Sequence, residues 1–436
     1  MSIAGMGEAN AAVSTETAFV FNSFSFLVHG VLVMFMAAGF AMLESGLVRA
    51  KNTATICLKN ISLYSIAGLM FYLIGYAVMY TNVDGGWIGT FDFLYNPAES
   101  ELGLLNAADA GKEAANAALL KDSSYASMSD WFFQMVFVAT AASIVSGVLA
   151  ERIKLWPFMI FVVVLAAIIY PIQGSWVWGA GWLSEMGFSD FAGSTLVHST
   201  GGWAALAGAV VLGARKGKYG PNGAVNPMPG ANLPLATLGT FILWFGWFGF
   251  NGGSQLALGS AADVTAIAIV YVNTNLAAAA GVVVAMIMTQ LMFKKVDLTL
   301  CLNGAIGGLV AITAGPDLQN HAYAILIGGI GGALVVIAVP LIDKMKIDDV
   351  VGAISAHLVS GIWGTLAVGL FGSGSIVTQF IGIVAIGAFV FVTSLIVWLI
   401  LKATIGIRAD EEEEMAGLDS SELGIEAYPE FGGGSR

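Results

Sequence analysis

The chain has 436 residues, of which 57% are hydrophobic and only 11% are charged. An ordinary soluble domain carries about 25% charged residues, so this composition excludes a soluble globular protein and indicates an integral membrane protein. The formal net charge of −12 is concentrated in two stretches that are too polar to span a membrane, one from Asp84 to Asp130 and the other after residue 405.

About 20 consecutive apolar residues cross a hydrocarbon core of about 30 Å. Along this chain the rule predicts an all-α membrane protein with eleven transmembrane helices, at residues 20–46, 58–81, 130–149, 155–176, 192–213, 233–253, 264–292, 298–315, 322–342, 348–372 and 377–403. We therefore expect one eleven-helix domain over residues 1–405 and a C-terminal tail over residues 406–436. The first twenty residues lack Lys and Arg, so we expect a short outside tail there rather than a cleavable signal peptide.

The basic residues are divided unevenly between the two faces of the membrane. With eleven spans, all but two of the 17 Lys and Arg residues, Lys59 among them, fall on the face that holds the C-terminus, and only Lys112 and Lys121 fall on the other. Cytoplasmic loops carry an excess of Lys and Arg, which predicts an outside N-terminus and a cytoplasmic C-terminus. An acidic run such as residues 410–414 is usually solvated, but the apolar residues that follow it also allow the tail to dock on a cytoplasmic surface.

Two histidines lie in similar surroundings within spans five and ten. The runs "GSTLVHSTGG" and "GAISAHLVSG" each place a glycine five residues before the histidine and another four residues after it. If the first ten spans form two five-helix halves, the odd number inverts the second half relative to the first. Inverted repeats of this kind place their functional site near the midplane, between the halves. We therefore expect His198 and His357 to meet there.

A lone histidine in a helix is often only a hydrogen-bonded core residue, and that alternative stays open for His29. A symmetric pair of ionisable side chains in a bilayer favours a pathway instead. Two neutral imidazoles that share a hydrogen bond would give an otherwise apolar passage small polar contacts. A permanent cation would find little there to replace its hydration shell, so the pattern favours water, ammonia or a similar small solute.

Aromatic side chains gather at the predicted outer ends of the spans. Phe133 and Phe137 are four residues apart on one helical face, and Trp178 and Phe250 lie near the outer ends of spans four and six. Trp and Tyr at membrane interfaces are usually plain anchors. The alternative is a cup that holds a small cation by cation–π contacts, with Ser254 adding a hydroxyl acceptor.

Asp190 immediately precedes span five, eight residues before His198. A carboxylate at that position suits a helix N-cap, where it accepts backbone N–H groups and is favoured by the helix dipole. Electrostatic support for a cation that arrives at the mouth of the passage is the open alternative.

No metal or cofactor is expected. Cys57 and Cys301 lie in separate spans, where they read as small buried side chains rather than as part of a disulfide framework or a metal cluster. No nucleophile motif or phosphate-binding loop indicates an enzyme, and nothing indicates a nucleic-acid partner.

Several segments, in one order along the chain, resemble the Amt/Mep/Rh ammonium transporter family, specifically its Amt branch. The resemblance runs from about residue 20 to residue 431 and rests on "AGFAMLESGLVRAKN", "GVLAERIK", "DFAGSTLVH", "GWFGFNGGS", "VNTNLAAAAG", "DDVVGAISAH", "SGIWGTLAVGLF" and "LGIEAYPEF". One departure is Leu358, which follows the second histidine where many members have glycine.

The resemblance assigns roles to particular residues. It implies an outer ammonium recruitment site, a gate above the pore, a twin-histidine pore and an aspartate that stabilises the recruitment region. The recruitment site is Phe137, Trp178 and Ser254, the gate is Phe133, Phe137 and Phe250, the pore pair is His198 and His357, and the supporting aspartate is Asp190.

The resemblance also implies a function and an assembly. NH4+ would be captured at the aromatic cup and lose its proton near the gate, and NH3 would pass the histidines, with net electrogenic transport and methylammonium as an analogue. The alternatives are an ammonium sensor or transceptor and a neutral gas channel for NH3 or CO2. The family further implies a homotrimer, a PII-type regulator at the cytoplasmic face, and a multi-pass location in a cell membrane, here a bacterial inner or plasma membrane.

Overall fold

The computed structural model describes residues 13–429. In this part of the chain the structure is all-helical, and its only β-type pairings are the isolated bridges Ile153–Arg408 and Tyr219–Val225. Most of the predicted outside tail and the final "GGGSR" lie outside the described residues. The first helix begins earlier than the sequence predicted, at Thr15, because Ser14 caps it by accepting a hydrogen bond from the Thr17 backbone N–H at 3.1 Å.

Ten helical stretches in the described chain are long and apolar enough to cross a membrane. They are α1 (Thr15–Leu47), η1 to α3 (Ala50–Tyr80), α6 (Ser127–Leu149), α7 to α8 (Leu155–Ser175), η5 with α10 (Ser194–Leu212), α11 (Leu233–Gly253), α12 (Ala261–Phe293), α14 (His321–Lys344), η7 with α15 (Ile354–Phe371) and α16 (Ile376–Thr404). The predicted span at 298–315 corresponds to a shorter apolar helix, α13 (Leu298–Ile312), of 15 residues. At about 1.5 Å per residue it is about 22 Å long, so the count of eleven spans stays a prediction.

Four of these stretches contain more than one element, and shorter helices lie in the connections. The second comprises η1 (Ala50–Asn52), α2 (Thr53–Met70), η2 (Phe71–Gly75) and α3 (Tyr76–Tyr80); the fourth comprises α7 (Leu155–Val164), η4 (Leu165–Ile169) and α8 (Tyr170–Ser175). The histidine helices comprise η5 (Ser194–Ser199) with α10 (Thr200–Leu212), and η7 (Ile354–Val359) with α15 (Ser360–Phe371). The connecting helices are α4 (Glu99–Asn106), η3 (Asp109–Gly111), α5 (Lys112–Asp122), α9 (Trp182–Glu185), η6 (Pro221–Gly223), α17 (Glu411–Ala416) and η8 (Asp419–Leu423).

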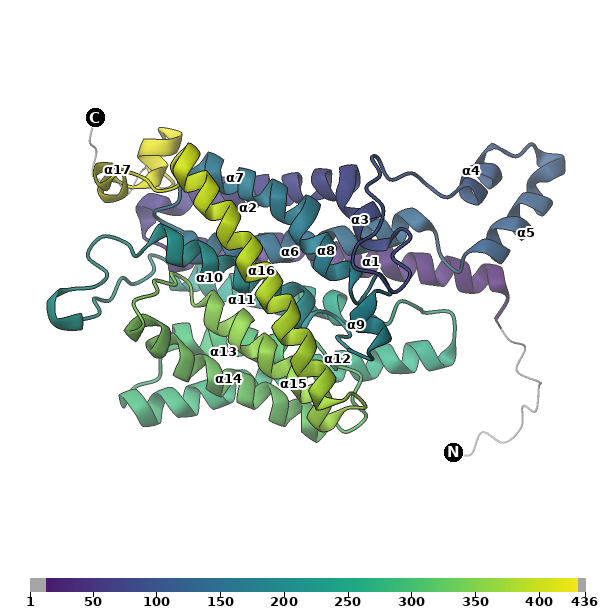
Figure 1. Ribbon diagram of the computed structural model, residues 1–436. Coiled ribbons are helices and arrows are strands. Elements are labelled where there is room, and N and C mark those ends of the chain that lie inside the picture. Colours follow the sequence, from purple (N-terminus) through teal and green to yellow (C-terminus); the bar gives the residue numbers. More distant parts are fainter. Residues whose placement is uncertain (1–12, 430–436) are drawn as a thin grey trace.

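The long helices lie side by side in one bundle, and α16 crosses the bundle obliquely (Figure 1). Helix α1 begins at one end of the bundle and α17 lies at the other, and we call these the N-terminal end and the tail end. The segment with α4 and α5 projects beyond the N-terminal end. The described termini therefore lie at opposite ends, as an odd number of crossings requires.

Glycines let the helices of the second half approach one another closely. A Cβ atom at Gly304 would lie 2.6 Å from the Ala285 Cβ and 2.9 Å from the Gly281 carbonyl oxygen, and one at Gly331 would lie 2.5 Å from the Gly307 carbonyl oxygen. Small residues at such crossings are what membrane bundles use to bring backbones together. The glycine-rich spans of this sequence thus serve packing.

Two sequence-based assignments are wrong. Lys59 is not a loop charge but is 1% exposed within α2, where its Nζ donates to the Ser146 carbonyl oxygen at 3.0 Å. The same serine donates its hydroxyl to Glu44 Oε2 at 2.7 Å, so Ser146 links Lys59 to Glu44 inside the bundle. Cys57 is exposed on the surface of the isolated chain, whereas Cys301 is buried as predicted.

The tail is docked on the bundle. The Glu414 carboxylate accepts the Lys216 backbone N–H at 2.6 Å and the Arg408 guanidinium at 2.7 Å. Farther along, the Asp419 carboxylate accepts the backbone N–H groups of Ala54 and Thr55 at 2.9 and 2.7 Å. The acidic tail therefore has basic and N–H partners at the tail end, where the sequence left open whether it docks.

Candidate functional site

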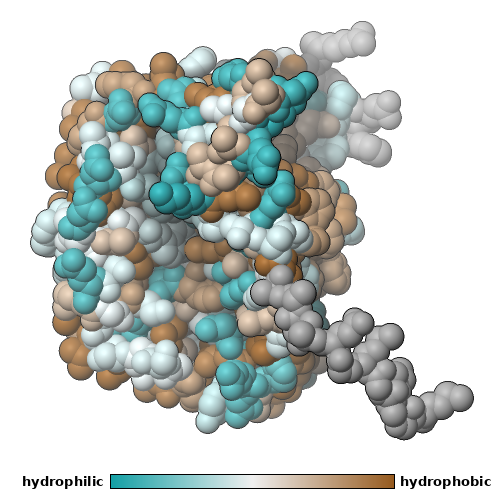
Figure 2. All heavy atoms as spheres, turned by 90° about the vertical axis from the view of Figure 1, so that its right-hand side faces the viewer, coloured by the Kyte–Doolittle hydropathy of each residue, from teal (hydrophilic) through white to brown (hydrophobic). Residues whose placement is uncertain are grey.

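A cavity of about 580 Å³ lies at the N-terminal end, and we call it the vestibule. Figure 2 looks onto this end of the molecule, which is hollowed near its middle with hydrophilic residues around the hollow. Four predicted site residues line the vestibule: Phe133, Phe137, Trp178 and Ser254. The other lining residues are Tyr76, Tyr80, Thr81, Asn82, Tyr95, Tyr125, Asp130, Gln134, Phe191 and Leu256.

Phe137 is the centre of an aromatic cluster at the inner limit of the vestibule. Its ring centroid lies 4.8 Å from that of Phe133, 5.9 Å from that of Trp178 and 4.1 Å from that of Phe250. The Phe250 ring is inclined by 31° to the Phe137 ring and does not line the vestibule. The pair Phe137 and Phe250 therefore separates the vestibule from what lies behind it.

Hydrogen bonds fix the two polar members of the predicted cup. Trp178 lies in the turn after α8, and its indole Nε1 donates to the Asp190 carbonyl oxygen at 3.0 Å. The Ser254 hydroxyl donates to the Phe250 carbonyl oxygen at 2.8 Å, which leaves its lone pairs free to accept. The cup thus combines aromatic surfaces with an oxygen acceptor, and both suit a small cation.

Asp190 caps the first histidine helix and is 3% exposed. Its two carboxylate oxygens accept the backbone N–H groups of four consecutive residues, Gly193 to Leu196, at 2.8 to 3.0 Å. Burial raises the pKa of Asp190, and these four donors oppose that rise. Because both oxygens are bonded to the helix start, the contacts of this side chain are those of a cap.

His198 and His357 lie together in the interior, 0% and 2% exposed. Their Nδ1 atoms are 3.2 Å apart and their ring centroids 5.2 Å apart, with the rings inclined by 27°. The His198 ring also stacks on Trp247 at 4.8 Å and on Phe250 at 5.1 Å. The first histidine therefore lies directly behind the Phe137–Phe250 pair.

The hydrogen bond between the imidazoles determines what they offer to a passing molecule. Since both partners are Nδ1 atoms, one ring must donate its proton and the other must accept it. If both rings are neutral, the donor ring has a bare Nε2 and the acceptor ring has an Nε2–H. The pair then presents one acceptor and one donor, and the Nε2 atom of His198 is buried without a partner in residues 13–429.

The two histidine segments share a local structure that was only partly predicted from the similarity of their sequences. Each histidine lies in a single π-helical turn, η5 or η7, preceded by a glycine with positive φ, +110° at Gly193 and +80° at Gly352. Asp349 accepts the backbone N–H groups of the three residues from Gly352 to Ile354 at 2.7 to 3.1 Å, as Asp190 does in the first segment. Burial raises the pKa of Asp349 to about 6 against these donors.

Sequence reasoning missed Asp349 although a signal for it was present. Asp190 stands eight residues before His198, and Asp349 stands eight residues before His357. The shared spacing would have assigned a cap to both segments.

Glycines after the histidines allow the two segments to cross. A Cβ atom at Gly361 would lie 2.5 Å from the Ser194 carbonyl oxygen and would also strike the Ser199 hydroxyl. One at Gly202 would lie 2.6 Å from the Cβ of Leu358. Leu358 is thus accommodated by the glycine of the opposite segment.

A narrow cavity of about 10 Å³ begins on the far side of the pair, at His357. Its lining includes the apolar side chains of Phe40, Leu43, Ile144 and Ile306 and the polar side chains of Glu44, Ser143 and Asn303. A space of this size holds about one water molecule. The order from the N-terminal end is therefore the vestibule, the Phe137–Phe250 pair, His198, His357 and a constricted cavity.

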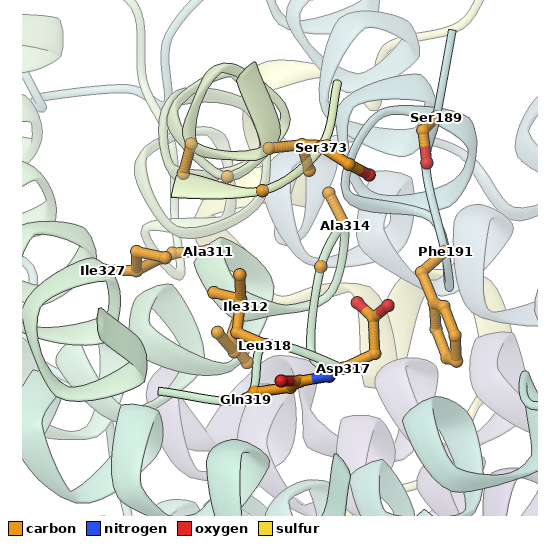
Figure 3. Close-up of a pocket in the computed structure, with 15 residues that line it drawn as sticks. Ser189, Phe191, Ala311, Ile312, Ala314, Asp317, Leu318, Gln319, Ile327 and Ser373 are labelled. Atoms are coloured by element: carbon orange, nitrogen blue, oxygen red, sulfur yellow. The ribbon is translucent and has the colours of Figure 1, made fainter. Parts of the chain in front are cut away.

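A second cavity, of about 340 Å³, lies beside the vestibule and contains none of the predicted site residues. Figure 3 shows the Asp317 carboxylate pointing into it, between Ala314 and the ring of Phe191. Phe191 lines both cavities.

The two remaining histidines, His29 and His321, lie outside the vestibule lining and the histidine pair and form hydrogen bonds of their own. His29 uses Nδ1 with the Ser25 carbonyl oxygen at 2.9 Å and Nε2 with the Tyr271 hydroxyl at 3.0 Å, so both of its nitrogens are satisfied. His321 opens α14, with its Nδ1 2.7 Å from the Asn273 Oδ1. His29 is thus the hydrogen-bonded core histidine of the alternative that the sequence left open.

Known proteins share this sequence and this arrangement of helices. The pattern that defines the Ammonium Transporter Family matches residues 24–428. The ammonium transporter Amt2 of Archaeoglobus fulgidus is 41% identical, with 93% of this chain and 87% of that protein covered. A putative ammonium transporter of Synechocystis sp. is 39% identical, with 94% and 89% covered.

Solved structures give the same result at the level of the fold. A structure titled Sensor Amt Protein superimposes with a TM-score of 0.84 at 37% identity, covering 94% of this chain and all of that one. The Mep2 protein of Candida albicans superimposes with a TM-score of 0.78 at 26% identity, covering 96% and 93%. From its sequence and its fold, this chain belongs to the ammonium transporter family, among relatives that carry the Amt name.

Proposed function

We propose that this protein transports ammonium across a membrane. NH4+ enters the vestibule and is captured by Phe137, Trp178 and Ser254. It loses its proton at the gate of Phe133, Phe137 and Phe250. NH3 then passes His198 and His357 to the other side, and the proton crosses separately, so that transport carries net charge. The names of the relatives support the substrate, and the order of the cavities supports the route.

Desolvation supports deprotonation between the cup and the histidines. In the cup the cation keeps aromatic faces and the Ser254 oxygen as partners, each aromatic contact contributing about 0.5–2 kcal/mol. Past the Phe137–Phe250 pair it would meet an almost dry passage, where burial disfavours the charged form of an amine. Neutral NH3 has one lone pair and three N–H groups, which match the donor and the acceptor of the imidazole pair.

The observation that carries the proposal is the hydrogen-bonded pair of buried histidines directly behind an aromatic pair that closes a cation-compatible vestibule. The hydrogen bond between the two imidazoles does not by itself explain why the pair lies directly behind the Phe137–Phe250 gate. A passage for a small neutral hydrogen-bonding molecule accounts for that alignment.

The same proposal includes the topology and assembly that the sequence and the resemblance predict. The protein crosses the membrane eleven times, as an inverted five-plus-five helix repeat with one extra helix. Its N-terminus is outside and its C-terminus is cytoplasmic. The protein is a homotrimer in a bacterial plasma membrane, with one pore per subunit, and the tail end offers the surface for a PII-type regulator. The matching Asp–Gly–His segments of η5 and η7 support the repeat.

Uptake and current measured together in proteoliposomes test the transport proposal. We expect saturable uptake of methylammonium, competition by ammonium, and an inward current on addition of either. Protein-free liposomes provide the control. Absence of protein-dependent flux would overturn the proposed function, and flux of ammonia without current would replace it by the neutral gas channel.

A further inference from the structure

Asp130 lies on the face of α6 that forms the vestibule wall. Phe133, Gln134 and Phe137 follow it at offsets of three, four and seven residues, which is one face of a helix. The sequence placed Asp130 at the edge of a polar outer loop, but α6 begins at Ser127 and Asp130 is 7% exposed in its first turn. A carboxylate is therefore part of the wall, one turn farther out than Phe133.

The contacts of Asp130 come from neutral groups. Its Oδ2 accepts the Tyr76 hydroxyl at 2.5 Å, and its Oδ1 accepts the Gln134 amide at 3.2 Å. In the described chain, residues 13–429, no Lys or Arg side chain forms an ion pair with it. A buried ionised group without a counter-charge is costly, and a cation that enters the vestibule would supply that charge.

Tyrosines surround the carboxylate and add surfaces that attract cations. The Tyr76 ring centroid lies 4.1 Å from that of Tyr95 and 4.9 Å from that of Tyr80. The Tyr80 hydroxyl is buried without a hydrogen-bond partner in the described chain, and this tyrosine lines the vestibule. Burial and then the negative charge of Asp130 raise the pKa of Tyr125, which also lines the vestibule, to about 12.

We propose that Asp130, with Tyr76, Tyr80 and Tyr95, forms a second cation-binding site in the vestibule, which concentrates small ammonium cations and passes them to the aromatic cup. The proposal deepens the proposed function and rests on it. Asp130 binds the substrate electrostatically while the cup binds it through ring faces. Because all the lining residues of the vestibule are neutral except Asp130, this one side chain sets the sign of its charge.

Half-saturation of methylammonium uptake in proteoliposomes tests the proposal. Asp130→Asn keeps the size of the side chain and an oxygen that can accept the Tyr76 hydroxyl, but it removes the charge. We expect the half-saturation concentration to rise about tenfold while the maximal rate stays within twofold. Asp130→Glu restores the charge and is expected to recover most of the affinity.

Asp317→Asn is the matched control. Asp317 is an exposed carboxylate of the neighbouring cavity (Figure 3) that lines no part of the vestibule, so its neutralisation should leave half-saturation unchanged. Thermal unfolding of each purified variant shows whether the fold is retained.

The outcomes separate the two proposals. If the wild-type protein carries no substrate, the proposed function fails. If the wild type transports and Asp130→Asn saturates at the same concentration, the site proposed for Asp130 is wrong. It is equally wrong if Asp130→Asn and Asp130→Glu lose affinity alike, or if Asp130→Asn loses only maximal rate, because a packing role then accounts for the residue.

Discussion

Each buried histidine is positioned by a capping aspartate and by glycines, which lie in its own segment and in the opposite segment. The aspartate eight residues upstream holds the helix start, a glycine with positive φ turns the chain into it, and a glycine four residues downstream leaves room for the other segment. The 3.2 Å distance between the Nδ1 atoms therefore depends on positions that never contact a substrate.

Gly361→Ala tests this dependence. The new methyl group would lie 2.5 Å from a backbone carbonyl oxygen of η5, which cannot move as a flexible side chain can, so η5 and η7 must separate. We expect uptake to fall at least tenfold and stability to fall by about 1–3 kcal/mol, the usual effect of overpacking.

The control for that substitution is Gly103→Ala in α4, where a Cβ atom meets nothing within 4 Å. Uptake and melting temperature of the two variants are measured side by side. Wild-type uptake by Gly361→Ala would show that the spacing of the histidines is not set by this crossing.

Sequence reasoning brought together the site residues whose chemistry stands out in a membrane. The histidine pair, the aromatic residues and Asp190 were singled out because an imidazole in hydrocarbon or an aromatic cluster is unusual. Asp130 and Asp349 were missed for different reasons. Asp130 was grouped with the polar loop before span three, whereas neighbours such as the Tyr76 hydroxyl bury it inside the helix. Asp349 lies inside the predicted span 348–372, and its spacing to His357 was not compared with that of Asp190 to His198.

Among the helices, α2 begins with a cap that comes from the other end of the chain. The side chain of its own N-cap residue, Asn52, makes no capping hydrogen bond and instead accepts the Leu418 backbone N–H at 2.9 Å. The tail residue Asp419 accepts the backbone N–H groups of Ala54 and Thr55, and the Thr55 hydroxyl at 2.9 Å. The hydrogen bonds that cap the start of α2 therefore also hold the tail on the bundle.

Asp419→Ala should weaken both the start of α2 and the docking of the tail. Loss of an N-cap carboxylate costs about 0.5–2 kcal/mol, so we expect a lower melting temperature and faster proteolysis of the tail. Limited proteolysis followed by mass spectrometry measures the second effect. Glu412→Ala, which removes an exposed carboxylate of α17, is the control. Equal cleavage rates in the wild type and Asp419→Ala would mean that the carboxylate does not hold the tail.

The elements show where sequence-based prediction ends. Long apolar runs predicted ten helices to within a few residues, except at the starts of spans two and ten and at the start of the chain. The short helix α13 could not be classified by length, since 15 residues is enough for a helix buried among others. The docking of the tail could not be predicted, because partners such as Ala54 and Asn52 lie more than 360 residues away in the sequence.

Across the whole molecule, the charged residues of the tail end form a paired network. Asp348 accepts two guanidinium hydrogen bonds from Arg215 at 2.9 Å, and Arg215 also faces Glu151 at 3.3 Å. Glu151 in turn pairs with Arg49. Burial alone would raise the pKa of Asp348, but the hydrogen bonds and charge of Arg215, with the charge of Arg152, hold it well below its ordinary value.

This lowered pKa predicts a stability that depends on pH. A carboxylate whose pKa is lower in the folded state stabilises the fold above its unfolded pKa of about 3.9. That contribution is lost as the pH falls from about 4 toward the folded value. Breaking a buried ion pair costs about 3–5 kcal/mol of stability. In Asp348→Asn the Arg215 guanidinium still faces Glu151, so we expect the free energy of unfolding to fall by an amount at the lower end of that range.

The measurement is the melting temperature of the wild type and Asp348→Asn at pH 7, 5, 4 and 3. We expect a constant gap from pH 7 to pH 5 that narrows below pH 4. A gap that is the same at pH 3 as at pH 7 would show that the ionised carboxylate contributes nothing.

In the proposed mechanism, ammonium crosses as NH3 past two neutral histidines that reject the cation. The double variant His198→Ala with His357→Ala tests this in proteoliposomes, by uptake of methylammonium measured together with the current carried by K+. We expect removal of both imidazoles either to abolish uptake or to let K+ carry a current that the wild type does not carry. Uptake at the wild-type rate, with K+ still excluded, would contradict this mechanism.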